Sequence, residues 1–358
     1  MSKFHPLTVS SVKNETRDTI VVTFDVPQDL QDAYRYTQGQ HLTLRAAINN
    51  EDVRRSYSIC SAAQENTLRV AIKRTPGGIF STWANDTLEA GTVIDVMPPS
   101  GHFNTPLSPN NSKHYMAFAA GSGITPLLSI IKTTLMAEPA SRFTLFYGNR
   151  ASSSVIFKEE LAELKDLYID RFNLAYVMSR EQQDIELFNG RISKQKCEQL
   201  FKSWVALENV DLAFICGPEQ MMHDVSEALQ LNGLPKEKIK IELFAASVPR
   251  RPHVPNARPI AGSEDCDVTL IIDGNHVAFT MDKDRESVLD AALKHGIDMR
   301  YSCKSGVCST CRCKVVDGKV DMDANYALED YEIARGFVLS CQSFPVTDKL
   351  VMDFDQDH

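Results

Sequence analysis

The spacing of four cysteines near the end of this 358-residue chain constrains its fold more than any other feature. Cys303, Cys308 and Cys311 follow the pattern C-x4-C-x2-C, and Cys341 stands farther along the chain. Cysteines with this spacing hold plant-type [2Fe–2S] clusters. Small residues between the first three cysteines favour a tight loop whose backbone N–H groups face the sulfurs. The pattern predicts that the four thiolates bind a [2Fe–2S] cluster and that the protein transfers single electrons.

Other uses of these cysteines agree less well with the sequence. Structural zinc sites usually combine two closely spaced cysteine pairs, whereas Cys341 stands alone. Disulfides are not expected, because residues 1–12 lack the apolar run and cleavage site of a signal peptide. The same observation predicts a cytoplasmic protein. Four further cysteines are expected to be buried without a ligand role: Cys60, Cys197, Cys266 and Cys313.

Charge is distributed unevenly along the chain. Residues 263–358 contain 19 acidic and 10 basic side chains and residues 1–262 contain 28 of each, so the C-terminal part carries the whole net charge of −9. An acidic surface repels nucleic acid and could attract a basic protein partner, although it could equally serve only solubility. The chain has no apolar stretch long enough for a membrane span, so we expect partners other than membrane or nucleic acid.

The length predicts two or three domains, and one segment marks a boundary between them. Residues 247–262 contain four prolines and three arginines without a periodic apolar pattern, which predicts a semi-extended linker. Beyond it, apolar runs at 268–272 and 277–280 flank turn residues and indicate a β-hairpin. Residues 287–295 have the pattern of an amphipathic helix. Residues 337–342, which contain Cys341, are expected to form a buried strand.

Two patterns of secondary structure precede the linker. Short apolar strands between turn residues predict an antiparallel barrel; they lie at 19–24, 41–44, 68–72 and 93–97. From Tyr115 onward, strands alternate with helices, which predicts a parallel α/β sheet. The expected strands lie at 115–119, 143–147, 174–178, 212–216 and 238–244, with one helix ending at Met136 and another at 158–167.

A glycine-rich loop follows the first strand of the predicted α/β sheet. Gly121 and Gly123 precede Thr125 and Pro126, which open a helix. Glycines at such a turn let backbone N–H groups approach a pyrophosphate at the positive end of the helix. Pro126 replaces the third glycine of the usual fingerprint, but proline is well tolerated in a first helical turn. The loop predicts a dinucleotide site; the alternative is an ordinary strand-to-helix turn.

The residues after the next two strands bear on which nicotinamide cofactor binds. An NAD site usually places an acidic residue there, whereas this chain has Arg150 after one strand and Ser179 with Arg180 after the other. Two guanidinium groups and a hydroxyl suit a 2′-phosphate. The residues therefore predict NADPH, with NADH possible; the alternative is that both arginines are ordinary surface charges.

Further motifs resemble those of the ferredoxin-NADP reductase family. Residues 55–58 match its R-x-Y-S signature and residues 77–81 its G-G-x-x-S signature, and residues 99–103 and 216–218 are similar to later family motifs. Within the family, the order of flavin, nicotinamide and C-terminal ferredoxin domains is that of oxygenase reductases. The segments 38–44, 301–308 and 338–342 are similar to those of reductase subunits of multicomponent phenylacetyl-CoA epoxidases.

The resemblance covers essentially the whole chain and implies a multidomain fold. The expected parts are an antiparallel β-barrel for flavin at 1–108, an α/β parallel sheet for the nicotinamide nucleotide at 112–246, the linker, and an α+β β-grasp ferredoxin domain at 263–358. The implied cofactors are FAD, with FMN as the alternative, NADPH and a [2Fe–2S] cluster. Flavin is needed because nicotinamide gives up two electrons together, whereas the cluster accepts one.

The resemblance also implies roles for individual residues. For the flavin they are Arg55 on a phosphate, Tyr57 on the ribityl chain or ring, Ser58 near N5, and Gly77, Gly78 and Ser81 at the pyrophosphate. For the nicotinamide nucleotide they are Gly121, Gly123, Thr125 and Pro126 at the diphosphate, Arg150, Ser179 and Arg180 at the 2′-phosphate, and Cys216, Gly217 and Pro218 near the ring. Phe244 stands where the family often has an aromatic residue against the flavin.

The implied activity is an electron relay without a catalytic dyad or nucleophile. NADPH would reduce FAD, and the cluster would pass single electrons to the oxygenase component of a multicomponent monooxygenase. The alternatives are another acceptor, such as a ring-hydroxylating dioxygenase, a desaturase or a hybrid-cluster protein, and a redox carrier or sensor without turnover.

Overall fold

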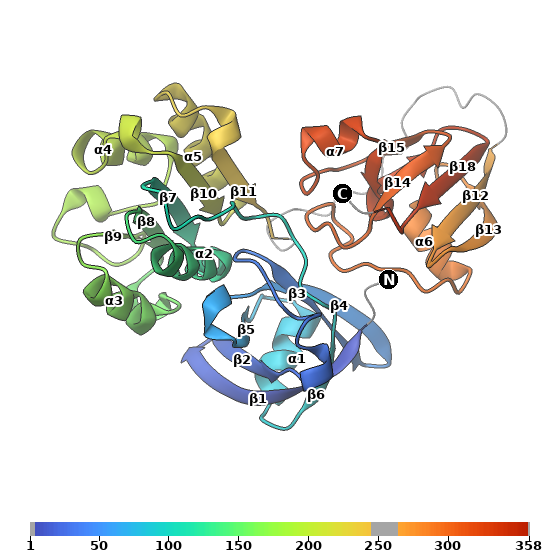
Figure 1. The fold of residues 1–358 in the computed structure, drawn as a ribbon, viewed down its shortest axis with the longest axis horizontal. Helices are drawn as coiled ribbons and strands as arrows, with labels where there is room; N and C mark the ends of the chain where they lie inside the picture. Colours follow the sequence, from blue (N-terminus) through green and yellow to red (C-terminus); the bar gives the residue numbers. More distant parts are fainter. Residues whose placement is uncertain (1–3, 245–263, 357–358) are drawn as a thin grey trace. The chain divides into compact units, whose positions relative to one another are not determined.

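The computed structural model describes residues 4–244 and 264–356, which belong to two compact units (Figure 1). The larger unit combines an antiparallel sheet with a parallel α/β sheet, and the smaller one is the C-terminal part. The predicted linker at 247–262 lies outside the described residues. None of the described helices combines the length and the apolar character that crossing a bilayer requires.

Six antiparallel strands form the first sheet, in the order β4-β3-β6-β1-β2-β5. They are β1 (His5–Thr16), β2 (Thr19–Asp25), β3 (His41–Ile48), β4 (Glu51–Ser58), β5 (Leu68–Lys73) and β6 (Val93–Val96). A bridge between Ile59 and Val70 connects the continuation of β4 to β5, so the two edges of the sheet meet and it closes into a barrel. The predicted antiparallel barrel is confirmed. The sequence analysis missed β1, β4 and helix α1 (Ile79–Thr87).

The second sheet is parallel and has the order β11-β10-β7-β8-β9. Its strands are β7 (His114–Ala120), β8 (Arg142–Asn149), β9 (Phe172–Met178), β10 (Leu212–Cys216) and β11 (Ile239–Glu242), and its helices are α2 (Ile124–Ala137), α3 (Lys158–Leu167), α4 (Lys194–Ser203) and α5 (Glu219–Leu231). Alternate residues of β7 belong to two different cores: Tyr115 and Ala117 pack with α2, whereas Met116 and Phe118 pack with α4 and α5. The sheet is therefore buried on both faces, as predicted for a parallel sheet.

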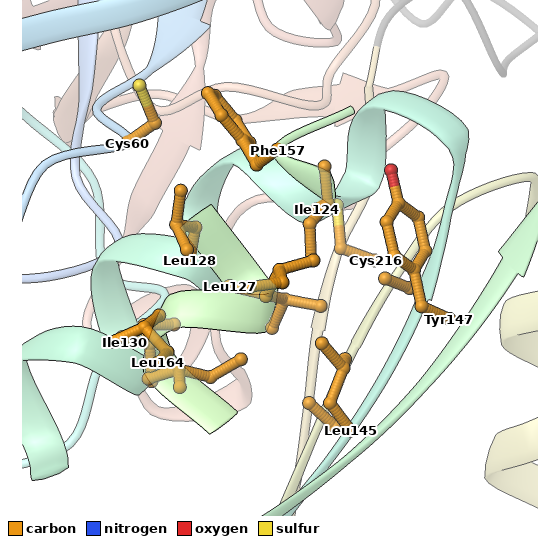
Figure 2. Packing of buried hydrophobic residues seen from close by; sticks show 14 of the residues in the cluster. Cys60, Ile124, Leu127, Leu128, Ile130, Leu145, Tyr147, Phe157, Leu164 and Cys216 are labelled. Carbon is orange, nitrogen blue, oxygen red and sulfur yellow. The ribbon is translucent and has the colours of Figure 1, made fainter. Parts of the chain in front are cut away.

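One apolar core joins the barrel to the parallel sheet. Cys60 from the barrel lies in the same cluster as Leu127 and Leu128 of α2, as Figure 2 shows. Phe103, which follows the barrel, meets Phe214 of β10 edge to face with ring centroids 5.5 Å apart. Because these side chains are buried in one core, the barrel and the parallel sheet stabilise each other and are expected to unfold together.

A cluster of four charged side chains crosses the same junction. Glu160 of α3 lies 2.7 Å from Arg69 of β5 and 2.6 Å from Lys132 of α2, and Lys132 also contacts Glu65 of the barrel. Nearby, the Ser129 hydroxyl of α2 donates to the Ser61 carbonyl at 2.7 Å. Burial by itself would raise the pKa of Glu160, but the two cations outweigh it and hold that pKa below its ordinary value.

The smaller unit is a mixed sheet with one main helix. Its strands are β12 (Asp265–Ile272), β13 (Asn275–Asp282), β14 (Arg312–Asp317), β15 (Val320–Met322), β16 (Phe337–Leu339), β17 (Ser343–Pro345) and β18 (Lys349–Asp353), and its helices are α6 (Val288–Lys294) and α7 (Asp330–Ala334). The predicted hairpin is β12–β13. The predicted helix is α6, whose cap is the Ser287 side chain accepting from the Asp290 N–H.

One strand prediction in this unit is wrong. Residues 337–342 were expected to be a single strand, but β16 ends at Leu339 and Ser340–Gln342 form a 3-10 helix. The Ser340 N–H and hydroxyl both donate to the Cys311 carbonyl at 3.1 Å, which draws the chain toward the loop of the first three cysteines. Cys341 therefore lies in a helical turn and not in a strand.

Glu160→Gln is expected to lower the free energy of unfolding of the larger unit by roughly 3 kcal/mol, because Arg69 loses its carboxylate partner and Lys132 keeps only Glu65. Urea unfolding followed by tryptophan fluorescence measures this, since both tryptophans, Trp83 and Trp204, lie in this unit. The contribution of a glutamate with a lowered pKa is present above its ordinary pKa and disappears as the pH falls through the lowered value. The difference from wild type should therefore shrink in acid.

Glu159→Gln is the matched control, because Glu159 is exposed in the same first turn of α3. It loses the same charge near the helix N-terminus but no buried partner. Equal destabilisation by the two variants would contradict a special role for the buried cluster.

Candidate functional site

The loops after β7 and β10 meet at the point where the strand order reverses, which is where dinucleotides bind in such sheets. Gly121–Gly123 form a 3-10 turn that leads into α2. A Cβ on Gly123 would lie 2.0 Å from the Cys216 carbonyl oxygen, so only glycine fits there. Gly217 is less confined, since a Cβ there would lie 2.6 Å from the terminal methyl group of the flexible Met221 side chain and 3.2 Å from Ala120.

The predicted nicotinamide residues are therefore brought together by backbone contact. Residues 121–126 lie against residues 216–218 although they are far apart in the sequence. The Thr125 hydroxyl donates to the Ser122 carbonyl at 3.0 Å and holds the turn. The Tyr147 hydroxyl donates to the Gly121 carbonyl at 2.9 Å, and Figure 2 shows Tyr147 beside Cys216 and Ile124. The N-terminus of α2, with its free N–H groups, could hold a diphosphate.

Arg150 and Arg180 are neighbours at the carboxyl edge of β8 and β9. The Ser179 N–H donates to the Asn149 carbonyl and the Arg180 N–H to the Arg150 carbonyl, both at 2.9 Å, so the strand pairing continues beyond the strand ends. Both arginines are exposed. Glu181 lies at the same edge, where hydrogen bonds from Ser152 lower the pKa of its carboxyl. The edge could hold a phosphate between two guanidinium groups.

The candidate flavin residues lie at two places in the barrel. Gly77, at a positive φ of 72° with open space around it, and Gly78 lead into α1. The buried Ser81 hydroxyl accepts from the Thr75 N–H at 3.0 Å and fixes this turn. Backbone N–H groups at the start of α1 could therefore hold a pyrophosphate.

The residues of the R-x-Y-S motif lie along β4 and differ in exposure. Arg55 is exposed, Tyr57 is half-buried and Ser58 is buried. The Tyr57 ring centroid lies 5.7 Å from that of Phe80 in α1. The alternation of β4 thus supplies a charged, an aromatic and a hydroxyl group along one strand, which could serve the phosphate, ring and N5 of a flavin.

Ser58, Cys216 and Glu242 form a meeting point of barrel and parallel sheet. Cys216 and Glu242 are register partners on β10 and β11, and the Ser58 hydroxyl lies 3.5 Å from the Glu242 carboxylate. Burial of the carboxyl group raises the pKa of Glu242 to about 8. Burial and the neighbouring Glu242 also raise the pKa of Cys216. The raised pKa values favour the neutral forms of Glu242 and Cys216, which together with the Ser58 hydroxyl could exchange hydrogen bonds with a bound ring.

Sequence reasoning assigned no role to Glu242. The available signal was an acidic residue at the end of the apolar strand 239–242, on the same edge as the predicted nicotinamide loop. Phe244, which was predicted to lie against the flavin, follows β11 and is partly buried against the core shared by barrel and sheet.

The four cysteines predicted as cluster ligands gather around one place in the smaller unit. The Sγ atoms of Cys303 and Cys308 are 3.2 Å apart, and hydrogen bonds from the Cys308 and Cys341 thiols lower the pKa of Cys303. The Ser305 N–H donates to the Cys303 sulfur at 3.3 Å. Cys308, Cys311 and Cys341 are buried. A set of four converging thiols with backbone N–H donors fits a [2Fe–2S] cluster.

The loop that carries these cysteines is confined by its glycine. Gly306 has a φ of +72°, and a Cβ there would lie 2.7 Å from the Ala324 carbonyl oxygen. Cys313, which was predicted to be a strand residue, is buried in β14 as expected. Cys60, Cys197 and Cys266 are also buried.

Comparison with known proteins agrees with this geometry. Residues 6–105 match the oxidoreductase FAD-binding domain, residues 118–227 the oxidoreductase NAD-binding domain, and residues 270–346 the 2Fe-2S iron-sulfur cluster binding domain. The chain is 46% identical over 355 residues to a component of 1,2-phenylacetyl-CoA epoxidase from Escherichia coli (strain K12), with 99% of both chains covered. The chain belongs to the ferredoxin-NADP reductase type of flavin and iron–sulfur reductases.

Other relatives serve different oxygenases. The chain is 35% identical to the ferredoxin reductase component of 3-ketosteroid-9-alpha-monooxygenase from Rhodococcus rhodochrous, over 97% of this chain and 96% of that protein. The solved structure of phthalate dioxygenase reductase has the same fold, with a TM-score of 0.57, 24% identity and 98% of both chains covered. An intact type IV self-sufficient cytochrome P450 monooxygenase matches 98% of this chain, with a TM-score of 0.68 and 22% identity, over 41% of its own length.

The predicted fold classes, the FAD and [2Fe–2S] cofactors and the enzyme class are confirmed by these matches. The enzyme transfers electrons from NAD(P)H through FAD to the [2Fe–2S] cluster, and it is of the kind that supplies oxygenase systems.

Glu242→Gln is expected to slow NADPH-driven flavin reduction roughly tenfold at pH 7, because the variant lacks an acidic proton beside the ring-binding site. In the wild type the rate should fall as the pH rises through about 8, where the carboxyl group ionises. Stopped-flow measurement of flavin bleaching from pH 6 to about 9 tests both points.

Ser58→Ala is the control variant. It should also slow flavin reduction, since it removes a hydroxyl near the ring, but it should keep the fall near pH 8 and leave the cluster spectrum intact. If Glu242→Gln retains the wild-type pH profile, Glu242 is not the titrating group.

Proposed function

We propose that this chain is the NADPH-dependent reductase component of a multicomponent phenylacetyl-CoA epoxidase and delivers single electrons to its oxygenase component. The proposal rests on 46% identity to a component of such an epoxidase along essentially the whole length of both chains, which includes all three cofactor-binding domains. Positioning of the two rings and the cluster is sufficient for this work, so no residue of the chain needs to act on a substrate carbon.

The preference for NADPH is supported by the edge of the parallel sheet. The backbones of Arg150 and Arg180 lie side by side at the ends of β8 and β9, and both residues are exposed, so a dianionic phosphate could pair with two guanidinium groups. A ribose hydroxyl gains no comparable charge pairing there. The Glu181 carboxylate is turned toward Ser152 by two hydrogen bonds, which is consistent with an edge that accepts an anion.

Arg180→Ala is expected to raise KM for NADPH about tenfold and KM for NADH little, because the loss of a phosphate ion pair affects only the phosphorylated cofactor. Steady-state assays with cytochrome c as acceptor measure both constants. Arg142→Ala is the matched control, since Arg142 is an exposed arginine at the opposite end of β8. Equal effects of Arg180→Ala on the two cofactors would refute the assignment of the 2′-phosphate site.

Coupled turnover tests the acceptor. Purified reductase, NADPH, the epoxidase subunits and phenylacetyl-CoA are mixed aerobically, and the ring-oxidised thioester is quantified. Product is expected only when the reductase is present. Reductase that is active on cytochrome c but gives no product with these subunits would assign the chain to another acceptor, such as a dioxygenase or a desaturase. A chain that does not turn over NADPH at all would be a redox carrier.

Cys341→Ser separates the two halves of the relay in the same assay. The variant lacks the fourth cluster ligand but keeps every candidate flavin and nicotinamide residue. It should therefore retain NADPH oxidation with ferricyanide, a small acceptor, and lose ring oxidation. Undiminished ring oxidation by a variant that lacks the cluster would overturn the proposed route.

A further inference from the structure

A buried ion pair lies beside the third cysteine of the cluster site and is not used by the relay described above. Arg312 directly follows Cys311, and its Nε atom lies 2.9 Å from Oε1 of Glu332 in α7. Glu332 is 1% exposed and the Arg312 side chain 12% exposed. Three other close ion pairs of this domain each include a partner that is more exposed than either of these side chains.

Both members of the pair are held in place. The second carboxylate oxygen of Glu332 accepts from the Glu329 N–H at 3.0 Å, which caps α7. The Arg312 guanidinium lies over the Phe337 ring at 3.9 Å from its centroid. Stacking and pairing together fix a planar cation better than a flexible ammonium group could be fixed.

The backbone of Arg312 belongs to the framework that carries the cysteines. Its N–H donates to the Ser309 carbonyl at 3.0 Å, within the loop of the first three cysteines. Arg312 also pairs in register with Leu339 of β16, two residues before Cys341. The backbone of Arg312 therefore connects the loop that holds three thiols to the strand that leads to the fourth.

A gain in the stability of the fold does not by itself explain why this ion pair is buried. Desolvating two charges costs free energy that their attraction only partly recovers, and apolar replacements of buried pairs are often neutral or stabilising. Charges in a poorly solvated place, however, act strongly on a neighbouring group whose own charge changes by one. A cluster that gains an electron is such a group.

We propose that Arg312 and Glu332 are positioning residues that set the reduction potential of the cluster. Glu332 holds the Arg312 guanidinium at a fixed place next to Cys311 and cancels its positive charge. The net charge beside the cluster is thereby kept near zero, and the backbone of the third ligand is anchored to α7. The inference rests on the assignment of the four cysteines as cluster ligands.

Glu332→Gln tests the pair. Glutamine has the same shape and can still accept from the Glu329 N–H, but it removes the negative charge that faces the Arg312 cation, and arginine does not deprotonate. The reduced cluster is more negative than the oxidised one, so the loss of the Glu332 negative charge should favour reduction by roughly tenfold, or about 59 mV for a one-electron couple. Anaerobic redox titration of the full-length protein, followed by the EPR signal of the reduced cluster, measures the potential.

Three further variants separate a charge effect from loosened structure. Arg312→Lys keeps the charge and should stay near the wild-type potential. Arg312→Met combined with Glu332→Gln removes both charges and should return the potential toward wild type. Arg312→Met alone should lower it. General loosening of the fold would shift the reduction potential of all these variants in one direction. Opposite shifts of the potential in Glu332→Gln and in Arg312→Met would require an electrostatic role.

Lys283→Met is the matched control, since Lys283 is 2% exposed and pairs with Asp348 at 2.6 Å in the same domain, away from the cysteine loop in sequence. It should destabilise the domain without moving the potential. An unchanged potential in Glu332→Gln would overturn the inference. If that variant does not retain its cluster, Arg312→Met decides, and an unchanged or raised potential overturns the inference.

Failure of the underlying assignment would look different. Wild-type protein without the visible absorbance and EPR signal of a [2Fe–2S] cluster would remove the four-cysteine site itself. A wild-type cluster that titrates normally, together with variants that titrate like it, would remove only the role of Arg312 and Glu332.

Discussion

The position of one carboxylate, Glu160, determines how the two cofactor-binding parts of the larger unit meet. It stands between Arg69 of the barrel and Lys132 of the nicotinamide sheet, and the core that contains Cys60 and Leu127 continues the contact. Hydride transfer requires two rings bound by different parts of the chain to approach within contact distance. The approach of Ser58 to Glu242 is a consequence of this junction, because each lies on a different sheet.

The poorly solvated ionisable groups of this structure are of two kinds, those that are ion-paired and those whose pKa is raised by burial. Where charges join elements, as at Glu160 and at Glu332, each carboxylate is paired with an arginine, and at Glu160 the nearby cations hold the pKa below its ordinary value. Where rings are expected to bind, burial is the main influence on Glu242 and Cys216, and it shifts both toward the neutral form by raising their pKa. Ion pairs hold the side chains that form them in place. Neutral groups can instead donate or accept a proton when charge develops on a bound ring.

Local motifs explain why much of this could be predicted. The cysteine spacing, the glycine loop at Gly121 and the strands of the parallel sheet are encoded by neighbouring residues, and all were found. Strand β4 was missed because most of its residues are polar, so it lacks the alternation of apolar and polar residues that indicates a strand. The 3-10 turn at Cys341 was missed because it depends on the hydrogen bond from Ser340 to Cys311. The local signal at Glu242, an acidic residue at a strand end, was not sufficient to assign a role, since that role depends on Ser58, which lies on another sheet. The structure and role of such residues depend on contacts between segments that are distant in the sequence.

Helix α7 illustrates how one short element can satisfy two requirements. Its inner side carries Glu332, which is fixed by Arg312, whereas Tyr331 and Ile333 on either side of it are 57% and 41% exposed. Substitutions at the exposed positions leave the ion pair and the helix cap intact, because neither side chain takes part in them. The exposed side chains and the ion-paired side chain therefore lie on adjacent residues of one helix, and the outer surface can change without removing the pair.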